Sequence, residues 1–463
     1  MKKFRSVLCI LLAVSVLLSF SGCSFRFSSF DDLLKPPKLS GKYQGLQDSF
    51  EKLVDKDYNL CTPENGSYRS AFIVNDFDHD NDEEAIVFYT VKKEPDLVKM
   101  YYFEFKDNDW EAVNSYDGLG SSVDQVMLAD VNRNGALEII IGWNLFSSKT
   151  NKVFSVYDIT GGKLKTISSF SYSTISVFDV NGDGIDDIFT INIDSSVPDK
   201  FTAEASVYSY DVKTASMTVL GSTKTDGNVS SYVDIVTEKV DDVKLIYVDA
   251  YKGDNDMITE IIYWDEETNK LVAPLFDVST QSTVQTLRHS RLRCMDVDQD
   301  GYLEIPSSVD MPGSSVYTEN SVAVTSSNSS SNNAESLYYT KWSKFRDGRI
   351  KATNYSVIDE ISGYILFVPS SWVGRITVLG NEGQWDYYHW DSYEEKIGKL
   401  LFSIYYYDKN DQKASNNLKS TKLLSSYSST VYVYKITADG VDFGVEDEIL
   451  KNNFNTTVLG GKK

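Results

Sequence analysis

Four short acidic segments of one design recur along the chain and constrain its fold more than any other feature. They begin at Asp76, Asp130, Asp179 and Asp296, so the steps between them are 54, 49 and 117 residues. We call these segments acidic turns one to four. Each places oxygen-bearing side chains at its first, third, fifth and ninth positions, the kind of spacing that gathers oxygen ligands around a hard cation such as Ca2+. The candidate metal ligands are Asp76, Asp78, Asp80, Asp82, Glu84, Asp130, Asn132, Asn134, Glu138, Asp179, Asn181, Asp183, Asp187, Asp296, Asp298, Asp300 and Glu304.

The spacing excludes an EF-hand, which closes its loop with a glutamate at position twelve. The residues at that position are Val87, Ile141, Thr190 and Ser307, and none is a carboxylate. A period of about fifty residues instead fits one four-stranded sheet with its loops, the unit of a β-propeller. The last step is close to twice the others, which predicts a further unit without an acidic turn. Strand-like runs at 232–236, 244–248 and 259–264 fill that interval.

Short apolar stretches precede all four turns and also follow the first three, which predicts a strand, a metal turn and another strand. On these residues the chain resembles the FG-GAP or VCBS repeats of integrin-like propellers, whose calcium motif is Asp-x-Asp-x-Asp-Gly-x-x-Asp. The resemblance covers residues 66–360. It implies a mainly β protein with about five propeller blades, or up to seven if the C-terminal third joins the ring, and Ca2+ in the turns as a brace.

Ligand charge ranks the four turns. Those beginning at Asp296 and Asp76 are expected to bind calcium best, and the turn beginning at Asp130, with only two carboxylates, to bind it worst. The alternative is that Asp, Asn and Gly simply form tight hairpin turns without a metal. A tight turn without a metal does not require an acid at every second position and a further acid four residues later.

The N-terminus has the pattern of a targeting segment. Three basic residues precede an apolar run from Val7 to Leu18, and the sequence Phe20-Ser-Gly-Cys23 follows. This resembles a bacterial lipoprotein signal, which implies removal of residues 1–22 and lipidation of Cys23. The protein would then be anchored to the cell membrane by lipid, facing outside the cytoplasm. An uncleaved membrane anchor is the alternative, although the apolar run is short for a span of about twenty residues.

Residues 23–65 are expected to form a tether with Pro36 and Pro37, followed by a helix. Leu46, Phe50, Leu53 and Val54 recur on one face of that helix, which would cap the first blade. The Ser/Asn-rich stretch 314–336 is expected to be a loop within the fifth unit.

Residues 361–463 are expected to form a small α+β domain. Apolar runs predict strands near 364–369, 375–379, 385–390, 400–405 and 431–436, and helical spacing predicts a helix over 445–454. This part resembles a small C-terminal domain of uncharacterised Gram-positive surface proteins. The likeness is carried by 368–372, Tyr388, His389, 401–404 and 431–433. The resemblance implies no particular chemistry.

A net charge of −22 argues against a nucleic-acid partner, because a strongly acidic surface repels phosphate. Of the four cysteines, Cys9 and Cys23 belong to the N-terminal segment. Whether Cys61 and Cys294 form a disulfide cannot be read from two residues in so long a chain.

No motif nominates a catalytic residue. The chain has only three histidines and lacks a phosphate-binding glycine loop, a zinc-type cluster and a nucleophile elbow. Two hypotheses remain. The favoured one is a non-catalytic binding or adhesion scaffold for an extracellular protein or glycan, because the only chemically specific motifs are metal braces. The alternative is a surface enzyme that degrades polysaccharide at the propeller channel, with Trp385 and Trp390 as sugar platforms.

Overall fold

Six antiparallel sheets, formed in chain order, make up most of the part of the chain that the structure describes. The computed structural model describes residues 41–456, except 55–56, 146–151, 160–161, 198–200, 314–337, 361, 382, 412–413, 415–417 and 419. The expected signal peptide, Cys23, the tether up to residue 40 and the Ser/Asn-rich stretch lie outside this part. The protein is mainly β, as the sequence predicts. None of the described helices has both the length and the apolar character needed to cross a membrane.

The first three sheets have the order expected of repeated units. The first contains β1 (Tyr58–Leu60), β2 (Phe72–Asn75), β3 (Glu84–Val91), β4 (Glu94–Lys106) and β5 (Asp109–Asp117). The second contains β6 (Ser122–Ala129), β7 (Glu138–Asn144), β8 (Lys152–Asp158) and β9 (Lys165–Tyr172). The third contains β10 (Thr174–Phe178), β11 (Asp187–Asp194), β12 (Thr202–Asp211) and β13 (Ser216–Thr225). Acidic turns one, two and three join β2 to β3, β6 to β7 and β10 to β11.

The predicted unit without an acidic turn is the fourth sheet. It contains β14 (Ser231–Val240), β15 (Val243–Lys252), β16 (Asp256–Asp265) and β17 (Lys270–Val272). Only Asp241 and Asp242 separate β14 from β15, and both have positive φ, 46° and 69°. Two left-handed residues in a two-residue loop match the twist of the strands they join, so a tight hairpin replaces the acidic turn here.

The fifth sheet contains β18 (Ile305–Asp310), β19 (Tyr338–Arg346), β20 (Arg349–Asp359), β21 (Tyr364–Val368) and β27 (Phe454–Asn455). Acidic turn four precedes β18. The boundary expected at 360/361 lies between β20 and β21, which pair with each other from Tyr355–Val368 to Asp359–Tyr364.

The sixth sheet contains β22 (Ile376–Asn381), β23 (Gln384–Asp391), β24 (Lys396–Asp408), β25 (Lys422–Tyr427) and β26 (Thr430–Ile436). The five strands predicted from apolar runs are present as β21, β22, β23, β24 and β26. The predicted helix over 445–454 is wrong in its bounds, because α5 spans Ala438–Phe443, α6 spans Asp447–Asn452, and the chain then enters β27.

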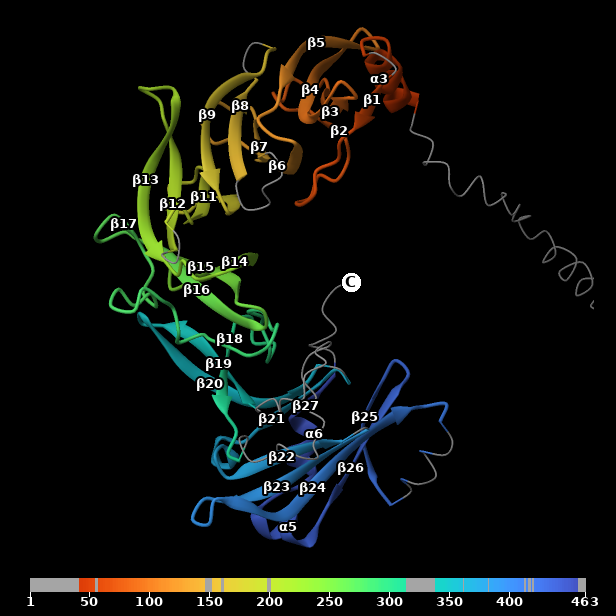
Figure 1. Ribbon diagram of the computed structural model, residues 1–463, viewed down its shortest axis with the longest axis vertical. Coiled ribbons are helices and arrows are strands. Elements are labelled where there is room, and N and C mark those ends of the chain that lie inside the picture. Colours follow the sequence, from red (N-terminus) through yellow and green to blue (C-terminus); the bar gives the residue numbers. More distant parts are fainter. Residues whose placement is uncertain are drawn as a thin grey trace, which may run out of the picture.

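The sheets follow one another along an arc, from the first at the orange end to the sixth at the blue end (Figure 1). Neighbouring sheets pack face to face and share apolar cores. Phe88 and Ile141 belong to the core between the first two sheets, and Tyr339 and Phe402 to the core between the last two. Because β3 and β7 are covered on both faces, nearly every residue in them is buried.

Helix α3 (Gly41–Glu51) covers the outer face of the first sheet. Leu46 and Phe50 are fully buried, as predicted, and the Phe50 ring lies edge-on against Tyr89 with 5.2 Å between centroids. Leu53, expected on the same face, follows the end of the helix and is 48% exposed. Helix α3 therefore ends the stack of sheets with an apolar cap.

Candidate functional sites

The four acidic turns have the same backbone shape. The residues at their fourth positions all have φ between 60° and 79°, and those at their sixth positions have φ between 74° and 90°. These residues are His79, Arg133, Gly182 and Gln299, and Asn81, Gly135, Gly184 and Gly301. Asn81 takes the left-handed conformation at the position where the other turns have glycine, as its short polar side chain allows. The repeat seen in the sequence is thus a repeat in conformation.

A buried carboxylate closes each turn from its ninth position. In every turn this carboxylate accepts a hydrogen bond from the backbone N–H of the second residue, over 2.7 to 3.1 Å. The donor and acceptor pairs are Phe77 and Glu84, Val131 and Glu138, Val180 and Asp187, and Val297 and Glu304. Burial raises the pKa of Glu84 and Glu138 to about 7 and that of Asp187 to about 6, because an apolar setting disfavours the charged form.

The donor set in turn one fits a calcium ion. Carboxylate oxygens of Asp76, Asp78 and Glu84 lie within 4.8 Å of one another, and Asp76 Oδ1 is buried without a hydrogen-bond partner. Three negatively charged groups held this close repel one another unless a cation lies between them. Asp80 and Asp82, also predicted as ligands, are exposed and lie outside this group.

Turn three also has an unpaired buried oxygen, Asp187 Oδ1. Its first residue, Asp179, accepts hydrogen bonds from the backbone N–H groups of Gly182 and Gly184 over 2.7 and 3.0 Å. Asn181 Nδ2 donates to Asp183 Oδ2 over 3.1 Å. Two predicted ligands of this turn therefore already bond to each other.

In turns two and four, a side chain of the protein itself lies against the closing carboxylate. In turn two, Asn132 Nδ2 donates to Glu138 Oε1 over 2.5 Å, so an amide faces the carboxylate that a cation would need. In turn four, Lys344 Nζ lies 2.8 Å from Glu304 Oε1, which makes an ion pair but no hydrogen bond. The four turns share one backbone, but their polar surroundings differ.

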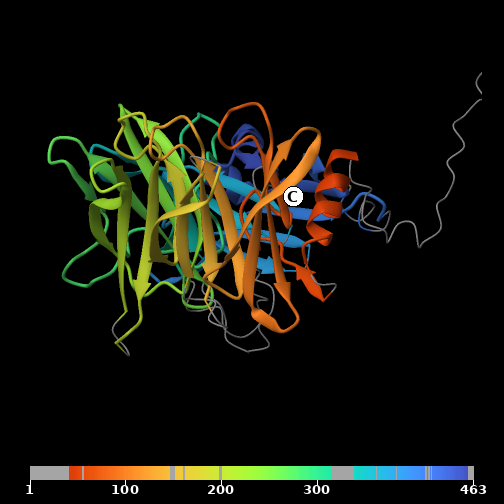
Figure 2. The same cartoon turned by 90° about the horizontal axis from the view of Figure 1, so that it is seen from above.

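The acidic turns lie at one end of the sheets, which we call the turn end, and a groove lies at the opposite end. The second, third and fourth sheets begin with β6, β10 and β14, and each of these strands runs from the groove toward the turn end. The strands of the second and third sheets run in nearly the same direction in Figure 2, so the two ends of these sheets are well separated. The groove has a volume of about 750 Å³ and lies between the second and third sheets. We call this end the groove end.

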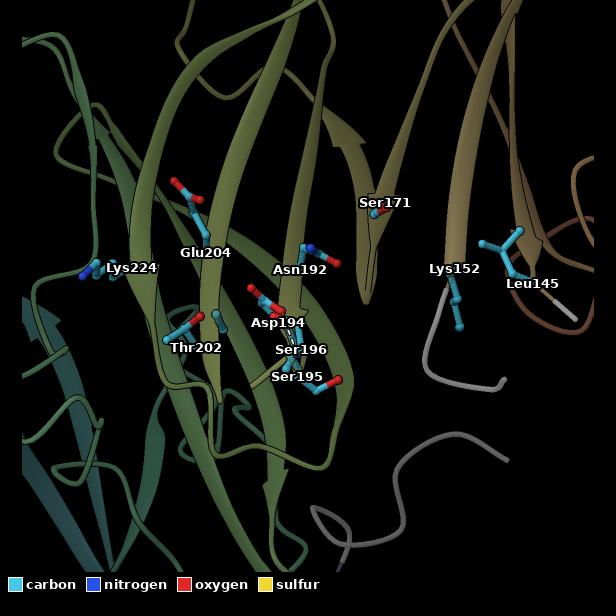
Figure 3. Close-up of a pocket in the computed structure, with 12 residues that line it drawn as sticks. Leu145, Lys152, Ser171, Asn192, Asp194, Ser195, Ser196, Thr202, Glu204 and Lys224 are labelled. Atoms are coloured by element: carbon cyan, nitrogen blue, oxygen red, sulfur yellow. Dashed lines mark hydrogen bonds between the residues drawn. The ribbon is translucent and has the colours of Figure 1, made fainter. Parts of the chain in front are cut away.

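A row of polar side chains crosses the third sheet in the groove (Figure 3). Asn192 of β11 pairs with Glu204 of β12, which pairs with Lys224 of β13. Directly paired residues project from the same face of a sheet, so these three side chains share the face toward the second sheet. Nearer the turn end, Ile188 and Tyr208 occupy this face and belong to the core shared with the second sheet. The replacement of apolar by polar side chains toward the groove end explains why the two sheets do not close there.

Lys152 of β8 faces this row from the second sheet. Its Nζ lies 2.8 Å from Oδ1 of Asp124, a carboxylate that is 2% exposed. Tyr172 donates its hydroxyl to Asp124 Oδ2 over 2.5 Å, and Asn65 Nδ2 donates to Oδ1 over 2.8 Å. The ammonium of Lys152 is thus fixed in place before any ligand binds.

A second cavity of about 510 Å³ adjoins the groove and shares Lys152, Ile193 and Ser195 with it. Phe201 lies at its edge and is 45% exposed. The first cavity is lined mainly by polar groups, whereas the second offers aromatic and aliphatic surface. The sequence signal for this site was weak, because its residues are scattered over six strands and the loops beside them.

Two other polar clusters occupy the fourth sheet, which has no acidic turn. Arg288 and Asp249 form a buried ion pair, and Thr259 bonds to both. Near the groove end, Glu260 accepts a hydrogen bond from the backbone of Asp226 over 2.8 Å. Sequence reasoning missed both clusters, because their members lie 34 and 39 residues apart.

The histidines form no catalytic arrangement in the described part of the chain. His79 Nδ1 lies 2.6 Å from the carbonyl oxygen of Gly135 and so connects turn one to turn two. His289 pairs with Asp256 over 2.7 Å at the surface. Cys61 and Cys294 are free thiols, which answers the question of their pairing.

No family model matches this chain, and no curated protein matches it. Among solved structures, it is similar to the periplasmic gluconolactonase of Pseudomonas aeruginosa, with 12% identity and a TM-score of 0.27 over 66% of this chain and 91% of that one. It is also similar to a putative 6-phosphogluconolactonase of Bacteroides fragilis, with 8% identity and a TM-score of 0.24 over 74% of this chain and 92% of that one. A third similar structure is Sqt1 of Saccharomyces cerevisiae, with 9% identity and a TM-score of 0.29 over 81% of this chain and 86% of that one. At such low identities and TM-scores, none of them assigns an activity to this chain.

Proposed function

We propose that this protein is a lipid-anchored, calcium-braced scaffold outside the cytoplasm that binds a glycan in the groove between its second and third sheets. The observation that carries the proposal is the polar row Asn192, Glu204 and Lys224 facing the fixed ammonium of Lys152. The anchor at Cys23 and the membrane location rest on the N-terminal sequence pattern alone. The calcium braces rest on the shape of the turns and, in turn one, on three gathered carboxylates with one unpaired oxygen, Asp76 Oδ1.

The composition of the groove favours a sugar chain over a charged polymer. Two lysines, two carboxylates, an amide and several hydroxyl groups line it, so no single sign of charge dominates. Such a mixture can both donate to and accept from the many hydroxyl groups of a glycan. The exposed ring of Phe201 at the adjoining cavity adds an apolar face on which a sugar ring can stack.

The two acids in the groove also raise the alternative of polysaccharide cleavage, which would use one carboxyl group as a proton donor. Asp194 is poorly suited to that role, because hydrogen bonds from the side chain and backbone of Ser196 lower its pKa. Glu204 is exposed and accepts a hydrogen bond from Ser222 Oγ. A general acid instead needs an apolar enclosure that keeps it protonated. Binding is therefore the better-supported function.

A glycan array probed with the purified protein tests this proposal. We expect binding to a restricted set of glycans, and the variants Lys224→Gln and Glu204→Gln to weaken it by roughly tenfold or more, because each removes a charge-assisted hydrogen bond. Lys213→Gln is the matched control, since Lys213 is exposed in the β12–β13 hairpin at the turn end. Binding that is equal in wild type and groove variants, or no glycan binding at all, would contradict the proposal. The glycans that bind are then incubated with the protein, and turnover that disappears in Glu204→Gln would establish the enzyme alternative instead.

A further inference from the structure

Acidic turn four contains a positive charge that belongs to the chain itself. Lys344 lies on β19, and its side chain is only 13% exposed. Its Nζ forms ion pairs with Oδ2 of Asp300 and, over 2.8 Å, with Oε1 of Glu304. Asp300 and Glu304 occupy the fifth and ninth positions of the turn. The ammonium therefore contacts two of the groups that a calcium ion would need.

The remaining acids of turn four are also bonded to protein donors. Asn354 Nδ2 of β20 donates to Asp298 Oδ2 over 3.0 Å. The two oxygens of Asp296 accept the backbone N–H groups of Asp300 and Gly301 over 3.0 and 2.9 Å. The carboxylates of Asp296, Asp298 and Asp300 do approach within 4.8 Å of one another, but each already has a donor.

Turn one has backbone donors of the same kind, because Asp76, Asp78 and Glu84 each accept one backbone N–H. It differs in its ion pairs, since among those of the described residues none involves these three acids. Asp76 Oδ1 is buried without a hydrogen-bond partner, and so is Glu304 Oε1 of turn four, but only Glu304 Oε1 has a cation of the chain beside it. Two turns of similar acidity and equal backbone shape thus balance their charge in different ways. The carboxylates of turn one can bind a cation from solvent, whereas those of turn four pair with the ammonium of Lys344 on β19.

A second cation lies beside Lys344, over the same aromatic ring. The guanidinium of Arg346 lies 4.6 Å from the centre of the Tyr302 ring, and Lys344 Nζ lies 5.5 Å from the same ring. Arg346 also lies 3.8 Å from Glu238 Oε2, while Glu238 Oε1 accepts the backbone N–H of Leu303 over 2.8 Å. A divalent ion entering turn four would meet two fixed positive charges, which disfavour it.

We propose that Lys344 is the internal cation of acidic turn four, and that this turn closes without calcium. This reverses the order given by ligand charge, which places turn four among the best calcium sites. The proposal also explains why Lys344 contacts Asp300 and Glu304, two acids that the repeat pattern alone predicts to be metal ligands. The inference is independent of the groove and of any glycan.

Calcium titration and thermal unfolding of the full-length protein test it with three variants. Lys344→Gln removes the charge but keeps most of the side-chain length. Asp298→Asn removes a predicted calcium ligand from turn four of the otherwise unchanged protein. Lys351→Gln is the matched control, because Lys351 lies on the adjacent strand β20 and pairs with Asp347 outside the turn. Bound calcium per chain is measured by equilibrium dialysis with CaCl2 alone, and the melting temperature is measured with chelator and with calcium.

We expect Asp298→Asn to bind as many calcium ions as wild type, since turn four holds none. Lys344→Gln should bind one more, and its melting temperature in chelator should fall by roughly 3 °C or more and recover with calcium. Lys351→Gln should match wild type in both measurements. Loss of one bound calcium in Asp298→Asn would overturn the proposal, as would unchanged calcium binding and stability in Lys344→Gln. If wild type binds no calcium at all, the proposed braces fail, whereas the stability of Lys344→Gln in chelator still decides the role of Lys344.

Discussion

Arg288 Nη2 lies 2.7 Å from Asp249 Oδ1, in a salt bridge whose two side chains are only 1% and 2% exposed. Arg288 also donates to the carbonyl oxygen of Leu292 over 2.6 Å and to Thr259 Oγ1 over 3.0 Å. Asp249 Oδ2 accepts the backbone N–H of Cys294 over 2.9 Å. The pair thus ties the irregular segment before acidic turn four to the fourth sheet.

The first prediction concerns this pair. Arg288→Met should lower the free energy of unfolding by about 3–5 kcal/mol, because it leaves the Asp249 carboxylate buried without a countercharge. Urea denaturation measures the loss. The double variant Arg288→Met with Asp249→Leu should recover much of it, since both charges are then gone. A double variant as unstable as the single one would show that packing of the arginine, and not charge balance, dominates.

The second prediction concerns calcium in turn one. Asp78→Asn should abolish binding of one calcium ion and reduce the rise in melting temperature on adding calcium, because it removes one of the three gathered carboxylates. Isothermal titration with chelator-treated protein measures the stoichiometry. Asp96→Asn, an exposed acid on β4, is the control and should behave as wild type. No heat of binding for wild type would refute calcium as the brace.

A third prediction follows from the pKa of about 7 for Glu84 and Glu138, against an ordinary value of 4.5. Between pH 4.5 and 7 the folded chain binds more protons than the unfolded chain, so the free energy of unfolding falls as pH rises through this window. Calcium-free protein should therefore melt at a higher temperature at pH 5.5 than at pH 8. Calcium should stabilise most at pH 8, where the ligands are ionised.

The double variant Glu84→Gln with Glu138→Gln should lose part of this pH dependence, about 2 kcal/mol per site before screening by solvent. Glu111→Gln, an exposed acid on β5, is its control. A pH dependence that stays the same in the double variant would assign the effect to the general acidity of the chain.

The fourth prediction uses the close approach of Gly142 to Tyr172. A Cβ atom at position 142 would lie 2.1 Å from the Tyr172 hydroxyl oxygen, so Gly142→Ala must displace a buried ring and its bond to Asp124. We expect a loss of about 1–3 kcal/mol in urea denaturation. Adding Tyr172→Phe removes the hydroxyl oxygen that the new Cβ would meet, so the double variant should recover part of the lost free energy of unfolding. Equal stability of Gly142→Ala and wild type would show that the ring moves aside freely.

The acidic turns and their flanking strands could be predicted from sequence because they are local patterns. The Gly or Asn at the sixth position of each turn is a residue type that favours the left-handed conformation found there. His79, Arg133 and Gln299 at the fourth position carry no such signal. The unit without a turn could be located by spacing alone. The tight hairpin at Asp241 and Asp242, which takes the place of an acidic turn in this unit, could not be predicted. A pair of acids does not by itself predict two positive φ angles.

The partners of the turns could not be predicted, because they depend on residues distant in sequence. Lys344 meets Asp300 across 44 positions, and Lys152 meets Asp124 across 28. The pairing of β27 with β21 crosses some ninety residues and involves only two pairs, Ile365 with Asn455 and Leu366 with Phe454. Local periodicity carries no signal for contacts of this kind, although they decide which turn can accept a cation and where the groove opens.

The two-residue connection between β14 and β15 also has a kinetic consequence. Strand pairing in the first and third sheets brings several carboxylates together as the acidic turn closes, and this mutual repulsion opposes closure until a cation binds. The β14–β15 hairpin closes without such a cluster, and nine residue pairs then form between two ten-residue strands. A short loop of this kind forms in microseconds. In a calcium-poor solution this hairpin is therefore expected to act as the nucleus of folding, with the sheets on its N-terminal side completed later.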